Sequence, residues 1–272
     1  MQSLMEVIGY IAAVLIGISL GLIGGGGSSL ALPVLVYLFH INAQAAVSDS
    51  FFIVGLASLA GALTYIYQKQ ICYKSVLVFG LPSVIGVFVA HRVIFKAIPE
   101  RIIVGNLIDI SKDMLILLFF SALMIAASVS MIRPLKSGTD PEVSGDDYPF
   151  MKLMLGGTAV GLVAGLVGAG GGFLIIPALV ILIRMPMKKA IGTSLMIITV
   201  NSAIGMFSHM SDHALSGWPF LLLFGGLAIC GILIGKYISK FVSGAKLKPA
   251  FGWFILVIGI FIITQQFYKI HP

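Results

Sequence analysis

Charged residues are scarce in this sequence. Its 272 residues include only 10 acidic and 17 basic side chains, so 10% of the chain is charged, against about 25% in an ordinary soluble domain. A soluble fold cannot cover its surface with so few charges, and 59% of the residues are hydrophobic. The shortage of charge excludes an ordinary soluble domain and makes lipid the expected solvent for much of the chain.

Cysteine is equally scarce, and no catalytic motif replaces it. Cys72 and Cys230 are the only two cysteines, which excludes a disulfide framework or a cysteine metal set. The sequence also lacks a nucleophile–base pair, a metallohydrolase motif and a phosphate-binding loop. His209 and His213 flank Asp212, but loop histidines are usually only solvated, so a metal site there is the weaker alternative. We therefore expect no enzyme activity, no cofactor and no metal.

The net charge of +7 does not indicate nucleic acid. The basic residues are scattered singly at the expected ends of helices. This pattern is typical of membrane topology signals rather than of a surface that follows phosphates. No nucleic-acid partner is expected.

Long apolar stretches dominate what is present. Several approach or reach the roughly 20 residues that cross a bilayer as a helix. The first stretch, Ile8–Ile23, is not preceded by a basic segment, so we interpret it as a retained helix rather than a signal peptide. The stretches are Ile8–Ile23, Ser75–Ala90, Met114–Ile132, Trp218–Gly235 and Phe251–Ile263.

A glycine-rich motif occurs twice. Residues 21–33 are GLIGGGGSSLALP and residues 165–177 are GLVGAGGGFLIIP. The same register carries Ser50 onto Ser194, and a shift of one residue carries Gly86 onto Gly231. Because the register holds through three successive elements, the chain is interpreted as a duplicated unit with halves 1–133 and 151–272.

Each half is expected to contain a helical hairpin followed by three transmembrane helices. The short helix after each glycine run has about 12 residues and spans about 18 Å, too little for a hydrocarbon core of about 30 Å. The hairpin should therefore enter and leave on one side. The expected hairpins are 4–40 and 151–184; the expected transmembrane helices are about 44–66, 74–92, 113–133, 188–209, 217–238 and 248–268; and 134–150 is a polar cytoplasmic linker.

An odd number of crossings in each half requires the two halves to be inverted relative to each other. In this arrangement twelve of the 17 basic residues lie in the cytoplasm, as the positive-inside rule favours. The four basic residues between positions 92 and 112 oppose it. The expected fold is an all-α polytopic protein of the inner (plasma) membrane, built from two inverted repeats, with both termini outside.

The two glycine runs, here called the tips, are predicted to bind a substrate. Glycine lets backbone N–H groups approach a ligand with no side chain in the way. The short helices, expected to begin at Ser28 and Gly172, offer unpaired N–H donors and a positive dipole end, which suit an anion. Two tips from opposite faces would meet near the midplane. The predicted tip residues are Gly24, Gly25, Gly26, Gly27, Ser28 and Ser29 in the first half, and Gly168, Gly170, Gly171 and Gly172 in the second.

A second group of glycines is spaced by four residues. This spacing is typical of helices that pack closely in lipid, and we assign packing alone to these positions. They are Gly17, Gly21, Gly157, Gly161 and Gly165.

Asp49 lies in a mostly apolar predicted helix, and its counterpart in the second half is Thr193. A carboxylate within the membrane is costly and is by default a functional hypothesis. It would carry a proton that couples to, or counterbalances, anion movement. Alternatively it is a helix cap or an interface residue. The polar side chains of the matched helices are also predicted to bind substrate, although each could instead bond a neighbouring helix: Ser50, Thr193, Ser194 and Asn201.

The paired GL(I/V)G(G/A)GG…P motifs, the stretch Ala190-Ile191-Gly192-Thr193-Ser194-Leu195 and the two-half layout resemble the TauE/SafE family of membrane permeases. The resemblance covers nearly the whole chain. It implies export or exchange of sulfite, sulfonates or related small organic anions, driven by an ion gradient. The first half departs from the motif, with Ser48-Asp49-Ser50 where the second has Gly192-Thr193-Ser194.

The leading hypothesis is a secondary transporter for a small anion. An anion channel is the alternative, although no long filter ring is recognisable; a membrane-embedded enzyme or an assembly subunit is weaker still. The expected partners are a small anionic substrate, the lipid bilayer, a coupling proton or cation, and a second copy of the chain in a homodimer.

Overall fold

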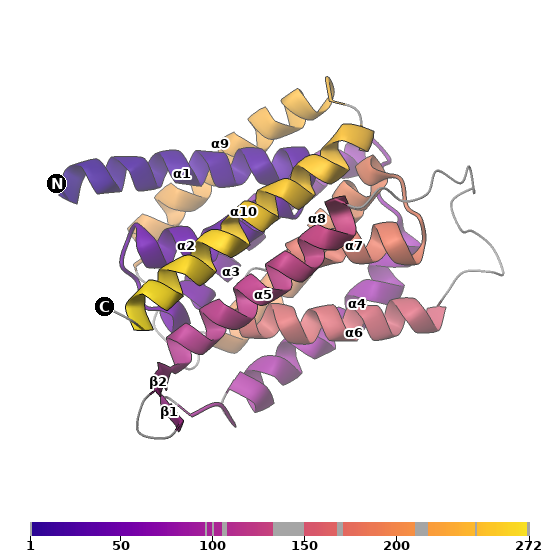
Figure 1. Cartoon of the computed structure of the whole chain (residues 1–272). Helices are drawn as coiled ribbons and strands as arrows, with labels where there is room; N and C mark the ends of the chain where they lie inside the picture. The colour runs from indigo at the N-terminus through magenta and orange to yellow at the C-terminus, as the bar shows by residue number, and fades with distance from the viewer. Residues whose placement is uncertain are drawn as a thin grey trace.

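The chain folds into a bundle of helices (Figure 1). The computed structural model describes residues 2–95, 97–99, 101–104, 108–132, 150–167, 171–209, 217–242 and 244–270. Seven of the helices in these ranges are long and apolar enough to cross a membrane. The expectation of a helical, polytopic membrane protein is confirmed.

The described part of each half contains five α-helices, of which the second is the shortest. The first half forms α1 (Gln2–Ile23), α2 (Gly26–Tyr37), α3 (Ala43–Tyr67), α4 (Tyr73–Val89) and α5 (Lys112–Ile132). The second half forms α6 (Phe150–Val167), α7 (Gly172–Leu182), α8 (Met187–His209), α9 (Trp218–Ser239) and α10 (Gly244–Ile270). The linker 134–149 lies outside the described residues.

One part of the first half departs from a purely helical chain. After α4 the helix widens into a π-helical segment, Ala90–Phe95. Two short antiparallel strands follow, β1 (Arg101–Val104) and β2 (Ile108–Ser111). Both strands are rich in isoleucine, a residue that favours extended structure. The all-α expectation omits this small hairpin, which precedes α5 and leaves the helical bundle unchanged.

The helices of the two halves interlock, and each contact has a counterpart when the halves are exchanged. Helix α1 packs on α9, as α6 packs on α4; α3 packs on α8, α5 on α10 and α2 on α7. The glycines spaced by four explain the closest of these contacts. A Cβ added to Gly17 would overlap the carbonyl oxygen of Ala228, and one added to Gly161 would overlap that of Ser83. The packing role assigned to these two glycines is confirmed.

The directions of the packed helices follow from the same contacts. Gly17 lies beside Ala228 and Gly21 beside Gly235, so α1 and α9 run parallel. In contrast, α3 and α8 run antiparallel, because Gly205 at the end of α8 contacts Phe51 near the beginning of α3, and Gly192 near the beginning of α8 contacts Tyr65 at the end of α3.

The remaining pairs include one parallel and one antiparallel pair as well. Gly157 contacts Phe79 and Gly165 contacts Val87, so α4 and α6 run parallel. Helices α5 and α10 run antiparallel, as the cartoon shows (Figure 1).

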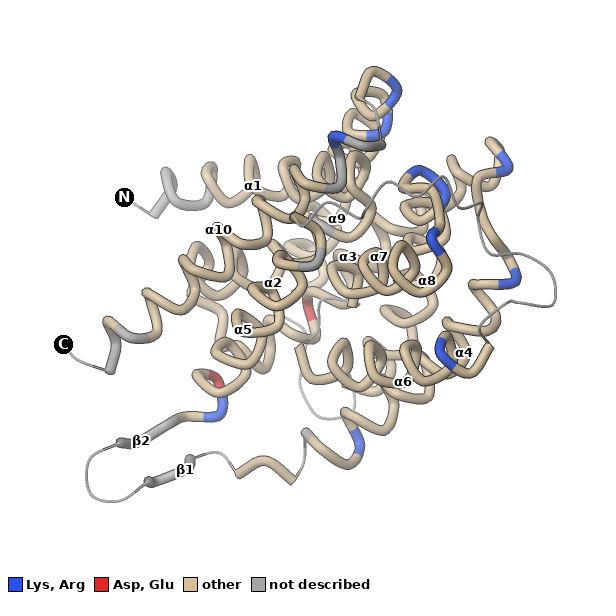
Figure 2. Tube along the Cα trace, turned by 45° about the vertical axis from the view of Figure 1, so that its right-hand side comes forward, with Lys and Arg blue, Asp and Glu red and all other residues tan. Residues whose placement is uncertain are grey.

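Most of the described basic residues lie at one end of the bundle, away from the two chain termini (Figure 2); Arg92 in the π-helical segment and Lys112 at the start of α5 are the exceptions near the strands. This end holds the C-terminal ends of α3 and α9 and the first turns of α4, α6 and α8. We call it the basic end and the opposite one the terminal end. The described basic residues near the ends of these helices are Lys69, Lys74, Lys152, Arg184, Lys188, Lys189, Lys236 and Lys240.

Candidate functional site

The two glycine tips lie against each other. A Cβ added to Gly25 would overlap the carbonyl oxygen of Gly172, and one added to Gly172 would lie 2.8 Å from Ser28 Oγ and 3.1 Å from Gly25 Cα. We call this region the tip contact. It brings together residues from the first and second halves that are far apart in the sequence. Gly168 and Gly170 lie outside the described residues.

Two glycines at the tips adopt backbone angles that other residues avoid. Gly24 has φ of +81° and Gly171 has φ of +71°, in the left-handed region that costs an L-residue roughly 1–2 kcal/mol. The Gly24 N–H donates the last α-helical bond of α1, to the Leu20 carbonyl at 2.7 Å, and the positive φ of Gly24 ends the helix. Helix α2 then begins at Gly26, two residues before the expected Ser28, because Gly26 and Gly27 are already helical. Helix α7 begins at Gly172, as expected.

The tip contact places the N-termini of α2 and α7 side by side. The first-turn N–H groups of a helix have no partner within it, and its dipole puts partial positive charge there. Two positive helix ends in one place repel each other, and a negative charge between them would relieve that repulsion. The ligand that this arrangement favours is an anion.

The serines near the tips bond mostly to their own helices. Ser28 Oγ donates to the Gly25 carbonyl at 2.7 Å. Ser50 Oγ donates to the Val47 carbonyl at 2.8 Å and Ser194 Oγ to the Ile191 carbonyl at 2.9 Å, two bonds that match in the repeat. These hydroxyl hydrogens are therefore used within the protein in this conformation. Ser29 is buried beside them.

Thr193 joins two helices. Its Oγ1 accepts a hydrogen bond from the Cys72 backbone N–H at 3.0 Å, which fixes the beginning of α4 against α8. Its counterpart Asp49 is fully buried in the second turn of α3. A carboxylate buried at this position is either a proton carrier or, like Thr193, a hydrogen-bond acceptor that holds the beginning of a neighbouring helix in place.

Several buried polar atoms of α3 and α8 have no hydrogen-bond partner within the described part of the chain. Asn201 Nδ2 donates to Ser83 Oγ at 2.7 Å, but Asn201 Oδ1 is unpaired, as are the hydroxyls of Ser58 and Ser202. Ile198, one turn before Asn201, contacts Gly172. Ser58 was not predicted as a site residue, although its match with Ser202 in the repeat is visible in the sequence.

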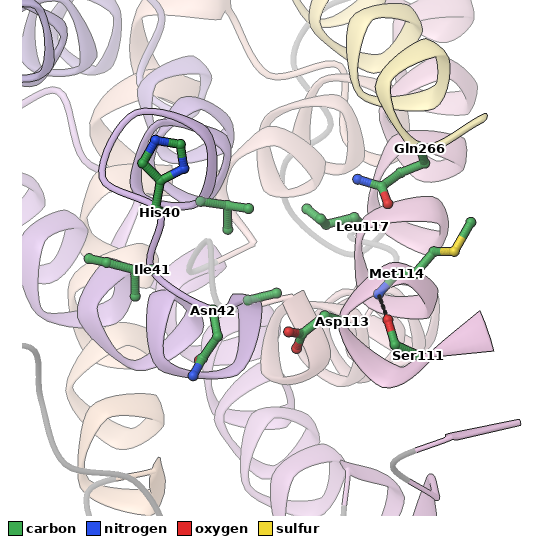
Figure 3. A pocket seen from close by; sticks show the side chains of 10 residues that line it. His40, Ile41, Asn42, Ser111, Asp113, Met114, Leu117 and Gln266 are labelled. Atoms are coloured by element: carbon green, nitrogen blue, oxygen red, sulfur yellow. Dashed lines mark hydrogen bonds between the residues drawn. The ribbon is translucent and has the colours of Figure 1, made fainter. Parts of the chain in front are cut away.

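A polar cavity of about 460 Å³ opens at the terminal end (Figure 3). The α2–α3 junction forms one wall with His40 and Asn42, and the first turn of α5 and the end of α10 form the other with Asp113 and Gln266. The Asp113 Oδ1 atom has no hydrogen-bond partner among the residues described. We call this the outer cavity.

An aromatic pair comes between the outer cavity and the tip contact. Leu117 lines the cavity, and Phe120 follows one turn further along α5. The Phe120 ring meets the Phe173 ring edge to face, with centroids 5.3 Å apart, and both rings are fully buried. Phe173 directly follows Gly172, so the pair closes this approach to the tip.

A smaller cavity of about 140 Å³ lies at the basic end. Its walls come from the end of α3, the beginning of α8 and the end of α9, with Tyr65, Lys188 and Lys236 among the lining residues. Ile191 also lines it and contacts Gly24 at the first tip. We call this the inner cavity; Ile191 separates it from the tip contact.

No group of three potential metal ligands occurs within the described ranges. The two residues Asp212 and His213, weighed above as a metal alternative, lie outside them.

The chain is similar to known membrane proteins over nearly its whole length. Residues 9–262 match the family model described as sulfite exporter TauE/SafE. A probable membrane transporter protein of Xylella fastidiosa (strain Temecula1) is 30% identical over 276 residues, covering 97% of each chain. The probable membrane transporter protein YunE of Bacillus subtilis (strain 168) is 27% identical over 283 residues, covering 96% of this chain and 99% of the relative.

A probable membrane transporter protein of the archaeon Methanocaldococcus jannaschii is 24% identical over 274 residues, covering 96% of this chain and 94% of the relative. No solved structure matches this chain. The family match begins within α1, includes both glycine motifs and ends within α10, so the chain belongs to the TauE/SafE family of membrane transporters.

Proposed function

We propose that this chain is a secondary transporter for a small anion of the sulfite or sulfonate type, bound at the tip contact. The observation that carries the proposal is the meeting of two helix N-termini, one from each half of the chain. Their dipoles and first-turn N–H groups favour a compact anion. The name of the matching family, sulfite exporter, supports sulfur oxyanions as the first ligands to test.

We also infer that the two halves are inverted in the membrane. In parallel repeats, α1 and α9 would run in opposite directions; their observed parallel course, with antiparallel α3 and α8, supports inversion. The cluster of basic side chains at one end supports a cytoplasmic position for that end. The inner cavity then faces the cytoplasm, while the outer cavity and both termini face outside.

The two cavities suggest how the anion reaches the tip contact. Each opens at a different end, and packed side chains separate each from the tips: Phe120 with Phe173 on one side, Ile191 on the other. Opening one barrier at a time would give alternating access, as in other transporters built from repeats. A channel would need both barriers open together. In this proposal Asp49 carries the coupling proton.

The test is a flux measurement in proteoliposomes. Purified protein is offered sulfite, sulfate, thiosulfate, sulfoacetate and acetate, each with and without a pH gradient. The proposal expects saturable uptake of at least one sulfur anion, accelerated by the gradient. Uptake that rises linearly with concentration and follows only the membrane potential would indicate a channel, and the absence of flux for every anion would refute the proposal.

A further inference from the structure

Lys236 is a buried basic residue that no described acidic residue neutralises. It lies in the last turn of α9 and is only 8% exposed. Its Nζ atom has no hydrogen-bond partner among the described residues and lies 2.8 Å from the centroid of the Tyr65 ring. A cation over an aromatic ring gains some stabilisation, but a buried ammonium group with no hydrogen bond remains costly.

The surroundings of Lys236 add positive charge rather than neutralise it. Lys188 and Lys240 line the same inner cavity, and none of its lining residues is acidic. The other lining side chains near the lysines are neutral hydrogen-bonding groups, Gln70 and Ser239 among them. Three lysines that share a cavity repel one another, so the cavity favours a negatively charged ligand.

We propose that the inner cavity is an oxyanion-binding site at the cytoplasmic mouth, with Lys236 as its fixed cation. The cytoplasmic assignment and the use of the site in transport rest on the proposed function. The inference that the cavity binds an anion rests only on the three lysines that line it. Ile191 contacts both this cavity and Gly24, so the site lies one residue away from the first tip. An anion bound here is held beside the barrier that it must pass.

The repeat shows that this site belongs to one mouth only. The register that carries Gly86 onto Gly231 also carries His91 onto Lys236. The equivalent position of the first half therefore holds a histidine instead of a lysine. This difference would give the two mouths unequal affinity for an anion, with the tighter site facing the cytoplasm.

Two sources supply oxyanions at this position. One is a free sulfur oxyanion in the cytoplasm, and the other is the phosphate of an anionic lipid headgroup, because the lysines lie near the expected membrane surface. The cavity volume of about 140 Å³ suits a compact anion. We therefore assign the site to the free oxyanion and make the headgroup an outcome of the test.

The experiment titrates the whole protein, in nanodiscs of neutral phosphatidylcholine, with sodium sulfite and sodium sulfate at constant ionic strength. The readout is the ligand-dependent rise in melting temperature. Lys236→Gln is compared with Lys246→Gln, which removes an exposed lysine of α10. Lys236→Met is a second variant that retains side-chain volume and removes a buried charge, so it should fold at least as stably as the parent.

We expect sulfite to stabilise the parent and the Lys246 variant equally, and both Lys236 variants to need at least tenfold more sulfite. Equal sulfite responses in all variants would overturn the site. The site would also be overturned if phosphatidylglycerol nanodiscs stabilised the parent while neither sulfite nor sulfate did, because the ligand would then be a lipid headgroup. Sulfite binding that depends on Lys236, combined with no flux in proteoliposomes, would support the site and refute the transporter. Sulfite flux in proteoliposomes, combined with equal sulfite-dependent stabilisation of all variants, would support the transporter and refute the site.

Discussion

Asp49 is fully buried in α3, where the second half has Thr193. If Asp49 carries a proton, Asp49→Asn should abolish uptake driven by a pH gradient and leave exchange of labelled sulfite largely intact, because only the coupling group is lost. Both rates are measured in the same proteoliposomes with equal protein incorporation.

The matching threonine defines the alternative for Asp49. Thr193 accepts a hydrogen bond from the Cys72 N–H, and Asp49 in the same role would only fasten a helix start. Asparagine retains an acceptor oxygen, so the variant would then keep its response to the pH gradient. Unchanged acceleration by the gradient would thus remove Asp49 from the coupling mechanism.

Gly27 packs closely against α1, a role that its position in the glycine run does not indicate. A Cβ at this residue would overlap the Ile16 carbonyl oxygen and lie 2.5 Å from the Leu20 side chain. Gly27→Ala should therefore lower the melting temperature of the protein, since overpacking typically costs about 1–3 kcal/mol. A variant that melts like the parent would contradict the tight α1–α2 contact.

The sequence indicates which residues are unusual at the tips but not which surface each one meets. The run Gly24–Gly27 predicts a break in the helix, and the break is found at Gly24 and Gly25. The direction in which Gly27 faces depends on how α1 and α2 pack, a tertiary contact that no local pattern specifies. For the same reason, the position of Lys236 over Tyr65 could not be foreseen.

At the scale of elements, the α4–α6 contact depends on glycines. Gly161→Ala should destabilise the protein by about 1–3 kcal/mol, because its Cβ would overlap the Ser83 carbonyl oxygen. Gly226→Ala in α9 is the matched control, since no atom lies within 4 Å of its Cβ. Thermal melting in detergent compares the two. Equal melting temperatures would mean that α4 and α6 are not in backbone contact.

The helical character of these elements was visible in the sequence because apolar runs and glycine breaks are local signals. The short lengths of α2 and α7, with 12 and 11 residues, follow from the distance between each glycine run and the next loop. The β1–β2 hairpin was missed, since two four-residue strands are too short to give a clear alternating pattern.

At the scale of the whole molecule, the proposed topology assigns each end of the bundle to one side of the membrane. In a variant without native cysteines, Gln44→Cys and Tyr268→Cys should react with an impermeant maleimide added outside intact cells. Gln68→Cys, an exposed position at the basic end, should react only after permeabilisation. Labelling of positions 44 and 68 from the same side would contradict three crossings in each half.

The central claim is that an anion passes through the tip contact, and exchange of labelled sulfite by a Gly172→Ala protein tests it most directly. The added methyl group would enter the region between the tips, where its neighbours are the movable end of Ile198 at 2.6 Å, Ser28 Oγ at 2.8 Å and the backbone Gly25 Cα at 3.1 Å. The two side chains can shift and the Gly25 backbone must give only slightly, so the variant should still fold, and Gly226→Ala again serves as the control.

A loss of about 1.4 kcal/mol in anion binding corresponds to a tenfold effect. We predict that exchange by Gly172→Ala falls at least tenfold at equal incorporation, with a melting temperature close to that of the parent, while Gly226→Ala exchanges sulfite normally. Exchange at the parental rate by a folded Gly172→Ala protein would contradict the claim that the anion binds where the two tips meet.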